Sequence, residues 1–170
     1  MMKTTLLALI APFFITACAT TEPQIVSLNS SWDSAKAAHI DKDGTNSVKG
    51  NAFMRQQGGG VVTCAGSTVT LIPATPYAVE RLTQLYGAGD SGFNSIRNFR
   101  FVPDPYEYQA MTRRTTCDSQ GNFQFERVPD GDYFVVTSVT WVVGYAQQGG
   151  NLMQRVRLMN AARPAIVMSR

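Results

Sequence analysis

The chain has 170 residues, which is enough for one domain of ordinary size. Fifteen Lys and Arg against twelve Asp and Glu give a net charge of +3, and no basic run exceeds Arg113-Arg114, so the composition argues against a nucleic-acid partner. A single His and the lack of any Cys-x-x-Cys pair argue against a metal centre, and no cofactor is expected.

The amino terminus has the pattern of an export signal. Lys3 precedes an apolar stretch over residues 6–15, which has signal-peptide length and is too short to span a bilayer. Residues 15–18, Ile-Thr-Ala-Cys, resemble the bacterial lipobox, which implies that residues 1–17 are a lipoprotein signal peptide and that Cys18 is the lipid (palmitate) attachment site. The alternative is an ordinary signal peptide that happens to lie near a cysteine.

The residue after Cys18 bears on the destination of the protein. Lipoproteins kept at the inner membrane usually have Asp there, whereas this chain has Ala19, so the resemblance implies an outer-membrane anchor facing the periplasm. Acyl chains hold such a protein on the bilayer of the cell envelope without a transmembrane helix.

Two cysteines remain once Cys18 is assigned to the lipid. Cys64 and Cys117 form an even pair in an oxidising compartment, which predicts a disulfide. Two buried free thiols are the alternative. A bridge would close both ends of the long segment between them.

Residues 18–44 are predicted to be a tether with a short N-terminal structured piece. Residues 19–28 offer little to bury, residues 30–38 favour a short helix capped by Asn29 or Ser30, and Trp32 is expected to pack onto the domain. Residues 41–45 resemble the start of a calcium loop. However, the closing position, Ala52, is not Glu, so a plain turn is expected.

Strand and helix signals then alternate. Residues 48–55 and the pair 61–64 and 68–73 favour strands, with a glycine-rich turn at 56–60 and a break at Ala65-Gly66. Thr75 and Pro76 predict a helix start and Gly87 its end. The apolar residues of this helix that share one face are Val79, Leu82, Leu85 and Tyr86.

The segment around residues 74–114 is predicted to be an insertion, and its part from 93 to 108 is rich in aromatic residues interleaved with arginine. Such a surface binds sugars or single-stranded nucleic acid, but rings of this kind also pack onto their own domain. Because long loops on a rigid frame often hold function, the insertion is the predicted partner surface. The candidate residues are Tyr86, Phe93, Arg97, Phe99, Arg100, Phe101 and Tyr106.

A meander of strands follows. Asp118 to Gly121 is a turn, Phe123 and Phe125 point to one face, and residues 129–132 form a second turn. A long strand begins at Tyr133 and continues to about Tyr145, residues 147–151 are predicted to turn, and residues 152–158 and 165–168 favour strands. Alternation predicts a core that includes Val69, Leu71, Phe123, Phe125, Tyr133 and Val135.

This meander resembles the signature of carboxypeptidase regulatory-like and Cna-B-like domains, which are accessory modules of secreted and surface proteins. The matching residues are Asp118, Gly121, Phe123, Phe125, Val128, Pro129, Gly131, Tyr133 and Val135, with residues 48–53 and 66–71 similar to the first two strands. The resemblance implies a mainly β fold over 45–170, a transthyretin-like antiparallel β-sandwich with a short helix in its insertion.

Function is predicted from place and fold, because no nucleophile, base and orienting group come together in the sequence and no enzyme is expected. The first prediction is a non-catalytic outer-membrane lipoprotein whose sandwich serves an envelope partner. The alternative is a carbohydrate- or peptidoglycan-binding module that uses the aromatic residues of the insertion. The membrane is thus one expected partner, and an envelope protein or a glycan the other.

Overall fold

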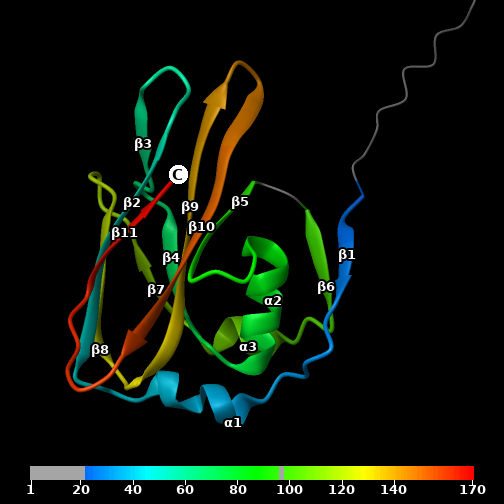
Figure 1. Cartoon of the computed structure of the whole chain (residues 1–170), viewed down its shortest axis with the longest axis vertical. Helices are drawn as coiled ribbons and strands as arrows, with labels where there is room; N and C mark the ends of the chain where they lie inside the picture. Colours follow the sequence, from blue (N-terminus) through cyan, green and yellow to red (C-terminus); the bar gives the residue numbers. More distant parts are fainter. Residues whose placement is uncertain (1–21, 96–97) are drawn as a thin grey trace, which may run out of the picture.

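Two β-sheets face each other in the computed structural model of the chain, which describes residues 22–95 and 98–170 (Figure 1). The predicted signal peptide, Cys18 and Arg97 lie outside the described residues. The mainly β sandwich predicted from the sequence is confirmed. Within the described ranges, no helix is long and apolar enough to cross a membrane.

The first sheet has five strands in the order β5-β10-β9-β4-β7, all paired antiparallel. Their bounds are β4 Thr68–Pro73, β5 Ser91–Ser95, β7 Arg113–Thr116, β9 Gly131–Val143 and β10 Ala146–Leu158. The β9–β10 hairpin is the longest feature of the fold and forms the spine of this sheet (Figure 1).

The second sheet is built around β2, Asn46–Arg55, which pairs with three other strands. On one side β11, Ala165–Ser169, runs parallel to it; on the other, β3, Val61–Thr63, and β8, Asn122–Val128, run antiparallel. The predicted strands at 48–55, 61–64 and 165–168 therefore exist, with ends shifted by one or two residues.

The core between the sheets follows from strand alternation. All six predicted core residues are buried, and they belong to one cluster with Leu152, Val156 and Leu158 of β10. Cys64 and Cys117 are joined in the predicted disulfide, with their Cα atoms 5.8 Å apart and a sequence separation of 53 positions. The bridge lies in the core and ties the end of β3, in the second sheet, to the end of β7, in the first.

The described part of the predicted tether is docked onto the domain, which corrects the sequence-based prediction. Strand β1, Gln24–Ser27, pairs in parallel with β6, Phe99–Val102, and Leu28 is buried. The Glu80 carboxylate accepts hydrogen bonds of 2.7 Å from the backbone N–H groups of Asn29 and Ser30. Apolar contact and this carboxylate together fix a segment whose composition suggests only a polar linker.

The short helix after the tether also begins later than predicted. Helix α1, Ser34–Ala37, is capped by Asp33, whose side chain accepts from the Ala35 N–H, and a 3-10 turn, η1 Ala38–Asp41, continues it. Trp32 packs edge-on against Tyr77 and Tyr108, with ring centroids 5.9 and 5.7 Å away, so its predicted packing role is confirmed.

The turn between β9 and β10 lies at Gly144-Tyr145 and not at residues 147–151. Gly144 has φ of 60°, which suits the first central position of a two-residue hairpin turn. Gly150 lies inside β10, where a Cβ would come within 2.8 Å of the Phe93 ring and 2.3 Å of the Asn94 carbonyl oxygen. The glycine-rich stretch thus serves close packing of β5 rather than a turn.

Candidate ligand-binding groove

The insertion does not form a separate recognition loop. Helix α2, Pro76–Tyr86, and helix α3, Tyr106–Ala110, lie over the outer face of the five-stranded sheet (Figure 1), and β5 extends that sheet at its edge. Helix α2 begins and ends as predicted, with the Thr75 hydroxyl accepting from the Ala78 N–H and Gly87 at the end.

The aromatic residues of the insertion mostly form a second core. Tyr77, Phe101 and Tyr108 are buried with apolar residues from the outer face of the sheet. The Arg81 guanidinium lies 4.0 Å from the Phe101 ring centroid and is paired with Asp104 at 2.6 Å. Burial raises the pKa of Tyr108 to about 12, which is consistent with its place in this cluster.

The predicted partner residues are therefore divided. Phe101 is buried, which corrects its assignment to a surface, and the partly buried Tyr86 and Phe99 pack against the same cluster. Phe93 packs against the core between the sheets. Arg100 and Tyr106 are exposed, the latter with 80% of its surface free.

A polar groove lies elsewhere, on the outer face of the second sheet. Along β2 the buried positions alternate with Ser47, Lys49 and Asn51, which point away from the core. The strand register places Lys49 between Ala165 of β11 and Gln124 of β8, and Asn51 between Val167 and Asn122. Two cross-strand rows of side chains thus extend across three strands on one face.

Two adjoining cavities of about 450 and 550 Å³ follow these rows, and both include Lys49 and Gln124. The first is otherwise lined by Gly44, Thr45, Asn46, Ser47, Glu126, Arg127 and Arg163. The second is lined by Gly50, Asn51, Thr115, Thr116, Asp118, Asn122, Phe123, Ala165, Ile166 and Val167. Together they form the groove.

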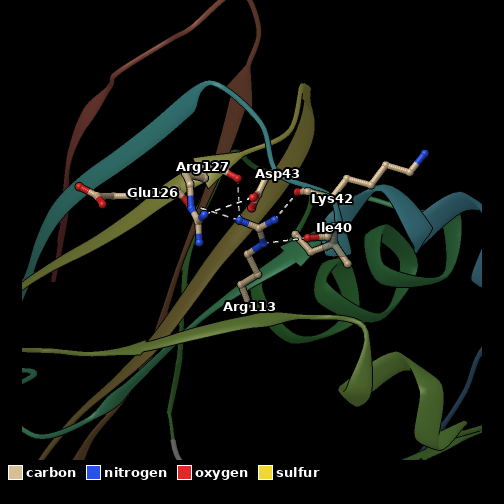
Figure 2. A network of polar contacts seen from close by, with 6 residues as sticks. All are labelled: Ile40, Lys42, Asp43, Arg113, Glu126 and Arg127. Atoms are coloured by element: carbon tan, nitrogen blue, oxygen red, sulfur yellow. Dashed lines mark hydrogen bonds and ion pairs between the residues drawn. The ribbon is translucent and has the colours of Figure 1, made fainter.

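An arginine network holds the rim of the first cavity (Figure 2). The Arg113 guanidinium donates to the carbonyl oxygens of Ile40 at 2.7 Å and Arg127 at 2.7 Å, and also to those of Lys42 and Glu126. It thereby joins the turn before β2 to the end of β8. Arg127, whose backbone has φ of 52°, lies at this junction and pairs with Asp43 at 3.2 Å.

Amide side chains are fixed in the second cavity by their neighbours. The Asn51 amide donates to the Gln120 carbonyl and to the Asn122 side-chain oxygen, both at 2.9 Å, and Asn122 donates in turn to Asp118. Asp118 also accepts from the backbone N–H groups of Gln120 and Asn122 at 2.8 Å, and the bonds from Asn122 are the main reason why its pKa lies below the ordinary value.

The groove offers a rigid set of hydrogen-bonding groups of mixed charge. Gln124 donates to Glu126 at 2.6 Å, so the three amides of the two rows, Asn51, Asn122 and Gln124, are oriented before any ligand arrives. Beside them Val167 has 64% of its surface exposed and gives the groove an apolar margin. Over residues 22–95 and 98–170, no group of three His, Cys, Asp or Glu is placed to hold a metal ion.

The sequence contains only a weak signal for this groove. Lys49, Asn51, Gln124 and Glu126 occupy the outward positions of two predicted strands, but the polar side of an amphipathic strand usually means only contact with water. The strand pairing that brings them together involves segments far apart in the chain.

Comparison with known proteins supports the fold. No protein-family model and no curated protein sequence matches the chain. A solved structure from Pseudomonas aeruginosa, described as a "putative carbohydrate binding protein", superposes with a TM-score of 0.67 at 17% sequence identity, over 83% of this chain and 99% of that one. The chain is therefore similar in fold to that bacterial protein along almost the whole length of the latter.

Proposed function

We propose that the protein is a non-enzymatic, lipid-anchored module of the bacterial cell envelope that binds a glycan in the groove on its second sheet. The observation that carries the proposal is the pair of cross-strand rows, Ala165–Lys49–Gln124 and Val167–Asn51–Asn122, which form an open, polar and pre-oriented surface. The lipid anchor rests on the lipobox-like sequence that ends at Cys18.

The chemistry of the groove suits a sugar. The Asn51 amide donates both of its N–H groups within the protein, so it offers its oxygen as an acceptor for a sugar hydroxyl. Gln124 donates one N–H to Glu126 and offers its oxygen and its second N–H, and Lys49 adds a strong donor. The exposed Val167 side chain offers an apolar contact for the C–H face of a sugar ring. A few fixed polar groups beside apolar surface are usual in ligand sites.

The structural neighbour and the burial of the aromatic residues in the insertion both support glycan binding in the groove. The neighbour shares the fold and is described as a "putative carbohydrate binding protein", which favours a glycan over other small ligands for this chain. Because Tyr77, Phe101 and Tyr108 are buried, they offer less to a ligand than the groove does.

A binding titration tests the proposal. The mature domain is titrated with purified peptidoglycan fragments and with a panel of envelope oligosaccharides, and compared with the Asn51→Ala/Gln124→Ala variant. Binding is expected to fall at least tenfold in the variant, since each lost hydrogen bond leaves a sugar hydroxyl without its partner. Thr140→Ala, an exposed polar residue on β9 outside the groove, is the matched control.

Two results would count against the proposal. Equal glycan binding by the variant and the control would remove the groove from the site, and a lack of binding to every glycan would favour a protein partner instead. The anchor is tested separately: Cys18→Ser is expected to release the protein from membranes, and a variant that stays in the detergent phase would contradict lipidation.

A further inference from the structure

The β9–β10 hairpin extends beyond the strands that flank it. On one side β4 pairs with β9 only from Tyr133 to Thr137, and on the other β5 pairs with β10 only from Gly150 onward. The end of the hairpin exposes Val142 at 69%, Val143 at 59% and the whole Tyr145 side chain. Three large side chains are thus exposed near the turn of this hairpin, whose end extends beyond the neighbouring strands (Figure 1).

A second hairpin ends beside the first. Strands β2 and β3 form it, β3 contacts β9, and Figure 1 shows both tips at the same end of the molecule. Val61 at the start of β3 is 54% exposed. Residues 56–79 and 133–154 contain no charged side chain, and the nearest charge on the second hairpin is Arg55 at the end of β2.

This end is uncharged: the second tip, residues 56–60, is polar and glycine-rich, and Val61, Val142, Val143 and Tyr145 are exposed at the same end. Exposed apolar side chains grouped at one end favour an interaction surface. The short segment between the predicted lipid site and β1 indicates that the partner of this surface is the membrane. Cys18 precedes Gln24, the first residue of β1, by six positions, and an extended chain spans at most about 3.5 Å per residue, or roughly 20 Å in all. With β1 docked on β6, a lipid at Cys18 holds the bilayer close to the domain.

The direction of β1 selects which end faces that bilayer. Figure 1 shows that β1 begins on the side toward which the two hairpin tips point and runs away from them. A short anchor that enters from this side brings the tips toward the membrane, whereas α1 lies at the opposite end of the molecule.

We propose that the tips of the β9–β10 and β2–β3 hairpins rest on the bilayer that holds the lipid anchor, and this inference depends on the anchor in the proposed function. Valine side chains leave water for the acyl boundary, and tyrosine favours the interface because its ring is apolar and its hydroxyl polar. Arg55 lies where an anionic headgroup is attractive. The contact is weak alone, but the anchor raises its effective concentration.

The orientation has a consequence for the groove. With the tips on the membrane, the long strands stand away from the bilayer, and the outer face of β2 and β8 is turned sideways into the periplasm (Figure 1). The groove then stays open to a ligand while the protein is anchored.

Fluorescence on vesicles tests the contact. The lipidated full chain with Tyr145→Cys is labelled at position 145 with the polarity-sensitive fluorophore NBD. It is then incorporated into vesicles of phosphatidylethanolamine and phosphatidylglycerol. Lys36→Cys in α1, exposed at the other end, is the matched control. Dithionite is expected to reduce the dye at position 145 several-fold more slowly than at 36, and nitroxide lipids to quench only the former.

A separate arm keeps failure of the anchor distinct from failure of the contact. The mature chain, with a histidine tag in place of Cys18, is held on nickel-chelating lipid and should show the same protection of position 145. Val142→Asp/Val143→Asp should abolish protection while the protein still floats with the vesicles. If both anchored forms float but position 145 reacts as fast as position 36, the proposed membrane contact is wrong. If only the lipidated chain fails to float, the predicted lipidation is wrong, and the tagged chain still tests the membrane contact.

Discussion

The outer faces of the two sheets differ in polarity, and therefore in whether another part of the chain must cover them. On the five-stranded sheet the outward side chains include Ile72, Phe134, Val136 and Met153, and the insertion covers them with α2, α3 and β6. On the second sheet the outward rows contain Lys49, Asn51, Gln124 and Asn122, and no element covers them within the part of the chain that the structure describes. The apolar face needs a lid, whereas the polar face is free to bind.

This difference explains the aromatic content of the insertion. A sheet that is apolar on both faces must bury both, so the chain supplies rings that pack on the second face. The rings of the insertion are therefore mainly structural, and the uncovered outer face of the second sheet is the better candidate for a ligand site.

The largest expected effect comes from removing the insertion, which covers the outer face of the five-stranded sheet. Replacing residues 78–106 with a short Gly/Ser linker exposes Ile72, Phe134 and Met153 and removes β5, so we expect loss of cooperative folding, measured by urea unfolding. From the sequence alone, with the insertion taken as a long loop, the shortened domain would be expected to fold. A shortened chain with an unchanged unfolding midpoint would show that the lid is dispensable.

The disulfide comes next, because it belongs to the core that both sheets share. For a loop of 53 residues, the chain-entropy relation gives a stabilisation of about 4 kcal/mol, and Cys64→Ala/Cys117→Ala should lower the free energy of unfolding by about that amount. Chemical denaturation checks this value. The reduced wild-type protein is the control, and a loss below about 1 kcal/mol would mean that the bridge adds little.

A pair of single substitutions then compares the two faces. Met153 is buried under the insertion, so Met153→Ala should cost about 2–5 kcal/mol by leaving a cavity. Val167 is 64% exposed on the open face, so Val167→Ala should change stability by no more than about 0.5 kcal/mol. Urea midpoints measure both, and similar losses at the two positions would contradict the distinction between covered and open faces.

The smallest effect concerns the link between the insertion and the N-terminal segment. Backbone hydrogen bonds from Asn29 and Ser30 lower the pKa of Glu80 from 4.5 to about 2. Because the folded pKa is depressed, the stabilisation is complete above pH 4.5 and is lost as the pH falls toward 2. Docking of residues 24–30 should weaken over that range.

Fluorescence of Trp32 in a Trp141→Phe background reports this docking, since Trp32 packs on Tyr77 and Tyr108. Glu80→Gln should give a signal that no longer titrates between pH 4.5 and 2, whereas Glu107→Gln, an exposed carboxylate in α3, should leave the titration unchanged. A Glu80→Gln protein with the wild-type titration would assign the pH dependence to another group.

The inner core and its disulfide were predictable from the sequence by itself. Phe123 and Phe125 alternate with polar residues, and Val69 and Leu71 do the same, because side chains in a strand point alternately to opposite faces. The turn at Asp118 to Gly121 was equally local, since an Asp side chain bonds its own backbone and Gly121 has φ of 79°. The Cys64–Cys117 pair was predictable from the even count that remains once Cys18 is assigned to the lipid, together with the oxidising compartment that the export-signal pattern predicts.

Only the tertiary structure decided which rings are core and where the groove lies. Alternation shows which residues share a face, but whether a face is covered depends on segments distant in the chain: Phe101 is buried because Phe134 and Met153 lie beneath the insertion. The role of Gly149 and Gly150 could not be predicted locally either, since glycine suits both a turn and close packing. In the structure the Phe93 ring lies against Gly150, so close packing is the reason for glycine there. Lys49 and Gln124 become neighbours through strand register, which long-range pairing determines and local sequence does not.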